Sequence, residues 1–247
     1  MSSPLLTLTR VESSLLLREP AAVLFTLALP LLLLSLNGSQ GNAPDPELGG
    51  AGLVDVLVPG YLVYVMATSS LMNLAETLAD HRDRGVLRRM RVSPLRPWQV
   101  LGSHALTHLA MSLLGCVLLV GAGLAVFDLR LPADVPATLL AVLASALAVL
   151  SIGFLLGAVL PTVRTTQAVA AALYFPSIFI SGALWPREML PDLAQRLSDV
   201  LPLTYAVAAI REAWSGGTLD VTALAVLALT TVVATTAGVR WFRWDSR

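Results

Sequence analysis

Two groups of side chains in this sequence have the types and spacing to do chemistry. His104 and His108 stand four residues apart, so a helix would place both imidazoles on one face, where they could hold a metal ion or haem. No cysteine or carboxylate lies near them along the chain to complete a site, which favours two polar side chains facing the interior of a helix bundle. No metal ligand is therefore assigned, and a metal or haem site stays an alternative.

The second group is the stretch HRDRGVLRRMRVSPLRPWQV at 81–100, which holds six of the sixteen basic residues, all of them arginines. Val86, Leu87 and Met90 form an apolar stripe beside a face of arginines, which predicts a short amphipathic helix. One interpretation is a membrane anchor, since each arginine near an anionic leaflet gains about 1 kcal/mol. The other is a docking site for a partner protein, because anchoring needs neither the stripe nor the nearby acids. Nucleic acid is not an expected partner, because no aromatic residue interleaves with the arginines before Trp98.

The elements that must position these groups are strongly apolar. Of the 247 residues, 56% are hydrophobic and 13% are charged, whereas about a quarter of a soluble domain is charged. Six long uncharged windows can each cross a hydrocarbon core about 30 Å thick as a helix of about 20 residues. We therefore expect an all-α membrane protein with six transmembrane helices in a single domain, 1–247. The expected spans are 20–36, 56–75, 100–126, 137–160, 167–185 and 221–239.

The placement of arginine predicts the orientation. With six spans both termini lie on one side, and if that side is the cytoplasm it holds twelve of the sixteen arginines, as the positive-inside rule expects. We therefore expect a multi-pass protein of the cell membrane with both termini cytoplasmic. Leucines mixed with charges over 1–19 predict an interfacial helix along the inner membrane surface.

The outer segment between the fifth and sixth spans is too apolar for a plain loop. An apolar stripe recurs at helical spacing on each side of Pro202, formed by Leu193, Leu197 and Val200 before it and by Val207, Ile210 and Trp214 after it. The uncharged run in this segment is too short to cross a bilayer. We expect an outer helical hairpin that dips part-way into the outer leaflet and packs on the spans.

The chain contains no lysine. It therefore cannot form the phosphate-binding loop that ends in Gly-Lys-Ser/Thr, nor a lysine Schiff base. The interiors of the predicted spans hold no Asp or Glu, which argues against a proton-coupled carrier and an intramembrane protease. We expect no enzyme activity and no cofactor bound by this chain. If ATP drives the protein, another polypeptide must hydrolyse it.

Two stretches resemble a known family. Glu76 followed by RDRGVLRRMRVSPLRPWQVLGSH at 82–104 resembles the first cytoplasmic loop of type-2 ABC exporter permeases. The stretch FPSIFISGALWPREMLPDLAQRLSDVLPLTYAVAAIREAW at 175–214 resembles the region around the fifth span and outer hairpin of the same family. One departure is that Arg84 precedes the loop glycine, Gly85, where many members have Glu, and the acid here is Asp83.

The resemblance implies a permease that dimerises, with an identical or a different chain, and binds two ABC ATP-binding subunits that hold ATP and Mg. The loop between spans 2 and 3 would be the cytoplasmic coupling helix. Its implied interface with the ATPase consists of Glu76, Asp83, Arg84, Gly85, Val86, Leu87, Arg88, Arg89, Met90 and Arg91. The implied outer gate and hairpin consist of Ser181, Gly182, Pro186, Pro191, Pro202, Thr204, Tyr205 and Arg211.

The implied function is ATP-driven export of a drug-like or lipid-like amphipathic molecule. The arginine-only, alanine-rich composition looks most like the branch associated with antibiotic self-resistance, of the daunorubicin and doxorubicin type. Two alternatives stay open, namely an ATP-independent membrane assembly or immunity protein, and a haem- or metal-handling membrane protein that uses His104 and His108.

Overall fold

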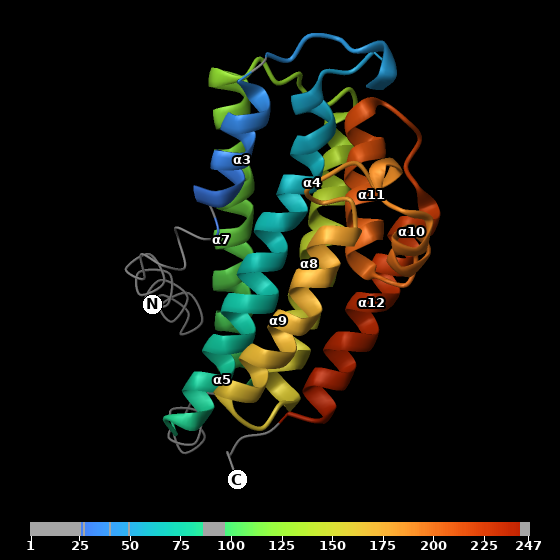
Figure 1. The fold of residues 1–247 in the computed structure, drawn as a ribbon. Helices are drawn as coiled ribbons and strands as arrows, with labels where there is room; N and C mark the ends of the chain where they lie inside the picture. The colour runs from blue at the N-terminus through green and yellow to red at the C-terminus, as the bar shows by residue number, and fades with distance from the viewer. Residues whose placement is uncertain (1–25, 27, 40, 49, 86–96, 243–247) are drawn as a thin grey trace.

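The structure is a computed structural model that describes residues 26, 28–39, 41–48, 50–85 and 97–242. Over these residues it is helical and contains no strand, which confirms the all-α prediction for this part of the chain. Figure 1 shows an elongated bundle in which most helices run along its length. The helices are α3 (Leu29–Gly38), α4 (Leu53–Ala67), α5 (Ala75–Asp83), α7 (Pro97–Val126), α8 (Val135–Val159), α9 (Val163–Ile180), α10 (Asp192–Ser198), α11 (Pro202–Ser215) and α12 (Val221–Arg240).

The centre of the bundle is one continuous helix made of three parts. The π-helical segment η3 (Thr68–Leu74) joins α4 to α5, so the helix runs unbroken over Leu53–Asp83. Most of α4 and η3 is buried against α3, α7, α8, α9 and α11. Its 31 residues span about 46 Å, which exceeds a hydrocarbon core of about 30 Å. The predicted span 56–75 lies within this helix, which is longer than one crossing requires.

Four helices in the described part of the chain are long and apolar enough to cross a membrane: Leu53–Asp83, Gly102–Val126, Val135–Val159 and Val221–Arg240. They coincide with the predicted spans 56–75, 100–126, 137–160 and 221–239. The shorter helix α3 lies in the predicted region 20–36 and continues two residues beyond it. The predicted interfacial helix at 1–19, the first part of the first span (20–25 and residue 27) and residues 86–96 lie outside the described residues.

The fifth predicted span, 167–185, differs from the observed helix α9. The side chain of Thr162 accepts a hydrogen bond from the backbone N–H of Thr165 at 3.2 Å and caps the helix at its start. At the other end Ser181 caps the helix and Gly182 adopts a φ of +85°, a left-handed conformation that ends helices. Arg164 therefore lies inside the first turn of α9, and the chain turns before Trp185.

Two glycines allow the closest helix contacts in the bundle. A Cβ atom on Gly153 of α8 would lie 2.0 Å from the carbonyl oxygen of Ser70 in η3. A Cβ atom on Gly60 of α4 would lie 2.3 Å from the carbonyl oxygen of Ala183, in the turn after α9. Small residues at such positions let helix backbones approach in membrane proteins. The glycines therefore fix the π segment against α8, and the turn after α9 against α4.

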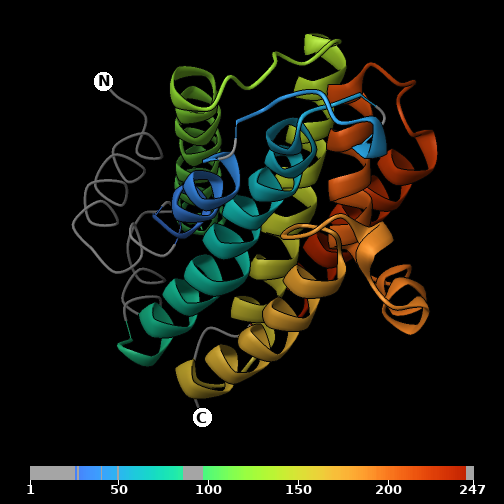
Figure 2. The same ribbon diagram turned by 45° about the horizontal axis from the view of Figure 1, so that its top comes forward.

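The segment between α9 and α12 contains two helices of different character. Helix α11 packs against α8, α12 and α4, and the predicted stripe of Val207, Ile210 and Trp214 is buried there. Helix α10 lies at the periphery of the bundle, where it is seen in orange (Figure 2). Leu193 and Leu197 are 70% and 55% exposed, so this stripe does not pack on the spans as predicted.

Candidate functional site

Charged residues lie at both ends of the bundle, whereas α10, with Asp192 and Arg196, lies part-way along its side (Figure 1). We call the end where α5 and α12 finish and α9 begins the arginine-rich end; it carries Arg82, Arg84, Arg164 and Arg240. The opposite end, where α4, α8 and α12 begin, we call the acidic end; it carries Asp55, Asp128, Asp134 and Asp220. In Figure 1 the arginine-rich end is at the bottom.

At the arginine-rich end, Arg82 is buried although it carries a charge. Only 2% of the residue is exposed, and its Nη1 donates to the carbonyl oxygens of Gly157 at 3.0 Å and Ala158 at 3.5 Å. Its Nη2 donates to the carbonyl oxygen of Leu160. The last carbonyls of a helix lack partners within the helix, and they carry the negative end of its dipole. The guanidinium of α5 therefore caps the end of α8.

The next residue, Asp83, contacts the beginning of the following helix. Its Oδ2 accepts a hydrogen bond from the backbone N–H of Val163, the first residue of α9, at 3.1 Å. A carboxylate is stabilised there because the first amides of a helix are unpaired and carry the positive end of its dipole. Two turns earlier in α5, Glu76 accepts a hydrogen bond from Nε2 of Gln167 at 2.7 Å. Three side chains of α5 thus hold the α8–α9 turn and the first turns of α9.

The described part of the predicted coupling interface ends at Gly85. Arg84 Nε lies 2.8 Å from Oδ1 of Asp80 in an exposed ion pair, and Gly85 has a φ of +68° that ends α5. The structure thus gathers Glu76, Asp83, Arg84 and Gly85 on α5. The six remaining predicted residues lie outside the described residues: Val86, Leu87, Arg88, Arg89, Met90 and Arg91.

The three histidines of the chain lie on the neighbouring helices α5 and α7. Nδ1 of His81 and Nε2 of His104 are 3.2 Å apart, and their rings meet edge to face with centroids 4.8 Å apart. His104 and His108 are both buried in the bundle, as the sequence favoured. Within the described residues no group of three His, Cys, Asp or Glu side chains is arranged to hold a metal ion.

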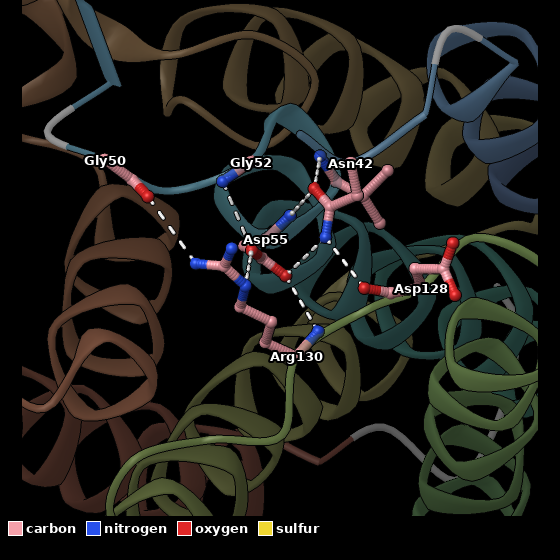
Figure 3. Close-up of polar contacts among 7 residues, drawn as sticks. Asn42, Gly50, Gly52, Asp55, Asp128 and Arg130 are labelled. Carbon is pink, nitrogen blue, oxygen red and sulfur yellow. Dashed lines mark hydrogen bonds and ion pairs between the residues drawn. The ribbon is translucent and has the colours of Figure 1, made fainter. Parts of the chain in front are cut away.

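At the acidic end, a polar cluster surrounds the carboxylate of Asp55 (Figure 3). Oδ1 accepts hydrogen bonds from Nδ2 of Asn42 and from the backbone N–H of Arg130, both at 2.9 Å, and Oδ2 accepts one from the N–H of Gly52 at 3.2 Å. Asn42 also donates to the carbonyl of Asp128 at 3.0 Å. The cluster therefore ties the loop before α4 to the loop between α7 and α8.

Three of the predicted outer-gate residues donate side-chain hydrogen bonds to backbone carbonyls of the hairpin region. Thr204 and Tyr205, in the first turn of α11, donate to the carbonyls of Ser198 and Asp199 at 2.7 and 2.9 Å. Arg211 donates to the carbonyl of Gly182 at 3.3 Å, which links α11 to the turn after α9. Burial lowers the pKa of Arg211 from its usual value, and the Glu188 carboxylate partly opposes this shift.

The other predicted residues of this region occupy helix ends. Ser181 is buried at the end of α9. The three prolines mark where helices begin: Pro186 before the 3-10 turn η4 (Arg187–Met189), Pro191 before α10 and Pro202 as the first residue of α11. These residues are thus placed to shape the hairpin.

A buried cluster of hydroxyl side chains, which no sequence pattern indicates, lies in the middle of the bundle. The hydroxyls of Thr68 in η3 and Tyr174 in α9 are 2.7 Å apart, and Ser69 donates to the carbonyl of His108 in α7 at 3.2 Å. π-Helical segments are rare in proteins, and those that occur are frequently found at functional sites. The π segment therefore joins α4 to both α9 and α7 by polar contacts.

Sequence reasoning missed several of these residues. Asn42, Asp55 and Arg130 are far apart along the chain and follow no spaced motif, so only the fold brings them together. No sequence pattern indicates Gln167, the partner of Glu76, either. Arg82 was counted as one of six loop arginines, and only its position at the end of a buried helix distinguishes it.

The apolar helices, with charges confined to their ends, define a multi-pass helical membrane protein. Residues 4–214 match the ABC-2 type transporter family, and the chain belongs to this family. Its relatives include the putative transport permease ycf38 of Cyanophora paradoxa, 30% identical over 80% of this chain and 69% of the relative.

Two further relatives are longer than this chain. ABC transporter G family member 20 of Dictyostelium discoideum is 23% identical over 64% of this chain and 22% of its own length. The probable multidrug ABC transporter permease YbhR of Escherichia coli K12 is 19% identical over 73% of this chain and 49% of its own length. The chain thus spans less than half of either protein. Together the matches place the chain among the membrane components of ABC-2 type transporters.

Proposed function

We propose that this chain is the membrane-spanning subunit of an ATP-driven exporter and takes its energy from a separate ABC ATP-binding subunit. The observation that carries the proposal is the match of residues 4–214 to the ABC-2 type transporter family. The absence of lysine supports it, because a chain without lysine cannot build the usual nucleotide-binding loop. ATP and Mg would then be held by the partner.

In this proposal the chain is one domain with six spans in the cell membrane, and both termini and the arginine-rich end face the cytoplasm. Four of these spans would be the long apolar helices. The other two would be α9, and α3 together with the residues before it. The asymmetry of charge supports the orientation, because arginines flank the cytoplasmic ends of spans. A second permease copy, identical or different, and membrane lipids would cover the exposed apolar faces of the helices.

The energy would enter at the loop that follows α5. Arg88, Arg89 and Arg91 would contact acidic residues of the ATPase, with Val86, Leu87 and Met90 in its groove. ATP binding in the partner can shift the permease between two states only if the partner binds the two states with different affinity. The length of the helix Leu53–Asp83 supports this loop as the contact, because 31 residues are more than one crossing needs and the end of α5 could lie outside the bilayer.

The cargo would be an amphipathic drug-like or lipid-like molecule that leaves through a path at the dimer interface. The name of YbhR, a probable multidrug permease, supports this class of substrate. Thr204 and Tyr205 would help form the outer gate, since they fix the start of α11 to the end of α10.

Co-purification tests the proposal. The permease is expressed with ABC ATP-binding subunits of the same genome, starting with the one encoded nearest, and is isolated in detergent. We expect one subunit to form a stable complex and the permease to change its rate of ATP hydrolysis. If no subunit binds and hydrolysis does not change, the ATP-independent assembly or immunity function takes its place.

A further inference from the structure

We propose that Arg82 and Asp83 are positioning residues that transmit movement of the loop after α5 to the α8–α9 turn. The inference rests on the proposed function, because it assumes that the ATP-binding subunit acts on this loop. It adds the route by which that action reaches the membrane helices. We call the two residues together the α5 clamp.

The α5 clamp holds both sides of the α8–α9 turn. Arg82 donates to carbonyls at the end of α8, and Asp83 accepts from the first amide of α9. Each charge matches the dipole of the helix end that it contacts. Because the two residues are consecutive in a helix, a displacement of the end of α5 acts on both helices at once.

The arginine of the clamp is buried. An arginine is almost never fully buried unless it is paired, and Arg82 is 2% exposed with its guanidinium on backbone carbonyls. The guanidinium cannot move gradually away from the end of α8, because the buried carbonyls that it leaves would lose their hydrogen-bond donor. The end of α5 and the end of α8 therefore move together or separate completely, as a two-state element requires.

The clamp lies directly before the loop that follows α5. Asp83 lies two residues before Gly85, where α5 ends with a φ of +68° and the arginine-rich loop begins. At its far end α9 leads into the turn at Gly182, whose carbonyl accepts from Arg211 of α11. The clamp thus lies where a force on the loop enters the bundle, and α9 connects it to the outer hairpin.

The test uses three single variants and a matched control. Asp83→Ala removes the acceptor, and Arg82→Gln removes the guanidinium. Val163→Pro removes the donated N–H while keeping the helix, because proline is favoured at the first helical position. The preceding Thr162 has φ −138° and ψ +158°, a conformation that proline accepts in its predecessor. Asp134→Ala is the control, since it removes a carboxylate that caps α8 at the acidic end.

The complex of permease and ATP-binding subunit is measured by hydrogen exchange with and without AMP-PNP, a non-hydrolysable ATP analogue. In the wild type we expect the amides of residues 164–167 to exchange about tenfold differently between the two conditions. Asp83→Ala, Val163→Pro and their combination should each abolish this difference to the same extent, because they remove the same contact. Asp134→Ala should keep it. If the clamp only stabilised the fold, its loss would change the exchange rates of these amides equally with and without AMP-PNP.

The outcomes separate the two proposals. Failure of the wild-type permease to bind any ATP-binding subunit overturns the proposed function, and this inference with it. A wild-type complex without a nucleotide-dependent difference at 164–167, or variants that keep that difference, overturns the inference alone. Loss of the difference in Asp134→Ala as well also overturns it. If Arg82→Gln does not fold, Asp83→Ala and Val163→Pro decide the result.

Discussion

The carboxylate of Asp55 accepts a hydrogen bond from the backbone N–H of Arg130 at 2.9 Å, and its second oxygen lies 3.8 Å from Nε of the same arginine. Asp55 lies in the first turn of the central helix, whereas Arg130 lies in the loop between α7 and α8. The carboxylate of Asp55 thus contacts both the backbone and the guanidinium of Arg130. This pair joins the start of α4 to the α7–α8 loop at the acidic end of the bundle.

Replacing Asp55 by Asn should destabilise the protein. An amide presents one acceptor and one donor, so one of the N–H groups that now face the carboxylate would meet another donor. We expect the free energy of unfolding to fall by about 1–3 kcal/mol. The matched change Asp128→Asn should alter it by less than about 0.5 kcal/mol, because Asp128 contacts Asn42 through its backbone carbonyl. Thermal unfolding in detergent compares the two variants, and equal losses would contradict the assignment.

Alanine at Gly153 should also destabilise the protein. Its Cβ would lie 2.0 Å from the carbonyl oxygen of Ser70, so α8 and the π segment would have to separate. We expect a loss of about 1–3 kcal/mol, as for other overpacked sites. Gly121 of α7 has no neighbour within 4 Å of a Cβ position, so Gly121→Ala should instead stabilise by about 0.5–1 kcal/mol. The opposite signs are read from the unfolding temperatures, and a stable Gly153→Ala variant would contradict the packing.

The hydroxyl pair of Thr68 and Tyr174 should show measurable coupling. The variants Thr68→Val and Tyr174→Phe each remove one hydroxyl with little change of shape. Hydrogen bonds between membrane helices contribute about 0.6 kcal/mol and up to about 1.7 kcal/mol. A double-mutant cycle of unfolding free energies should therefore give a coupling of about 1 kcal/mol. Strictly additive effects would mean that the two hydroxyls do not interact in the membrane.

Charge reversal in the loop should weaken the contact with the ATP-binding subunit. We expect Arg88→Glu combined with Arg89→Glu to abolish transport and to reduce complex formation, because the partner surface is predicted to be acidic. The wild-type complex should also weaken as salt rises, since exposed charges are screened. Arg240→Glu, at the same end of the bundle but on α12, serves as the control and should bind normally. Intact transport in the double variant would remove this loop from the mechanism.

The imidazoles of α7 should be dispensable for the transport reaction. The double variant His104→Ala, His108→Ala should transport as fast as the wild type per folded molecule, because neither imidazole has a chemical role in the proposed mechanism. Any loss of total transport should match the loss of folded protein. Transport is measured per folded protein, with the elution profile as the measure of folding. Complete loss of transport by a well-folded double variant would favour the haem- or metal-handling alternative.

Much of the fold follows from composition, because a membrane span has to be apolar whatever it packs against. The windows around 100–126, 137–160 and 221–239 coincide with long helices for this reason. Periodicity also located the buried face of α11 through Val207 and Ile210. The same periodicity did not predict that Leu193 and Leu197 are exposed, since a stripe specifies an apolar face but not its neighbour.

The contacts of the candidate site were less predictable. Glu76 and Asp83 stood out as acids beside the arginine cluster, and Gly85 only through the resemblance to a family. The partners of the two acids in α9 could not be read from the chain. The partners of Arg82 are backbone carbonyls, which carry no sequence signal. Asp55 likewise joins groups 13 and 75 residues away along the chain. Only the packing of the helices brings these groups together.

The central claim is that a separate ATP-binding subunit drives transport through this chain. The most direct measurement reconstitutes the complex into vesicles and follows two probes, rhodamine 6G as a drug-like cation and fluorescent NBD-phosphatidylethanolamine as a lipid. We predict that ATP drives movement of at least one probe, and that movement stops with a hydrolysis-deficient ATP-binding subunit. Movement of neither probe, or equal movement with the deficient subunit, would contradict the account.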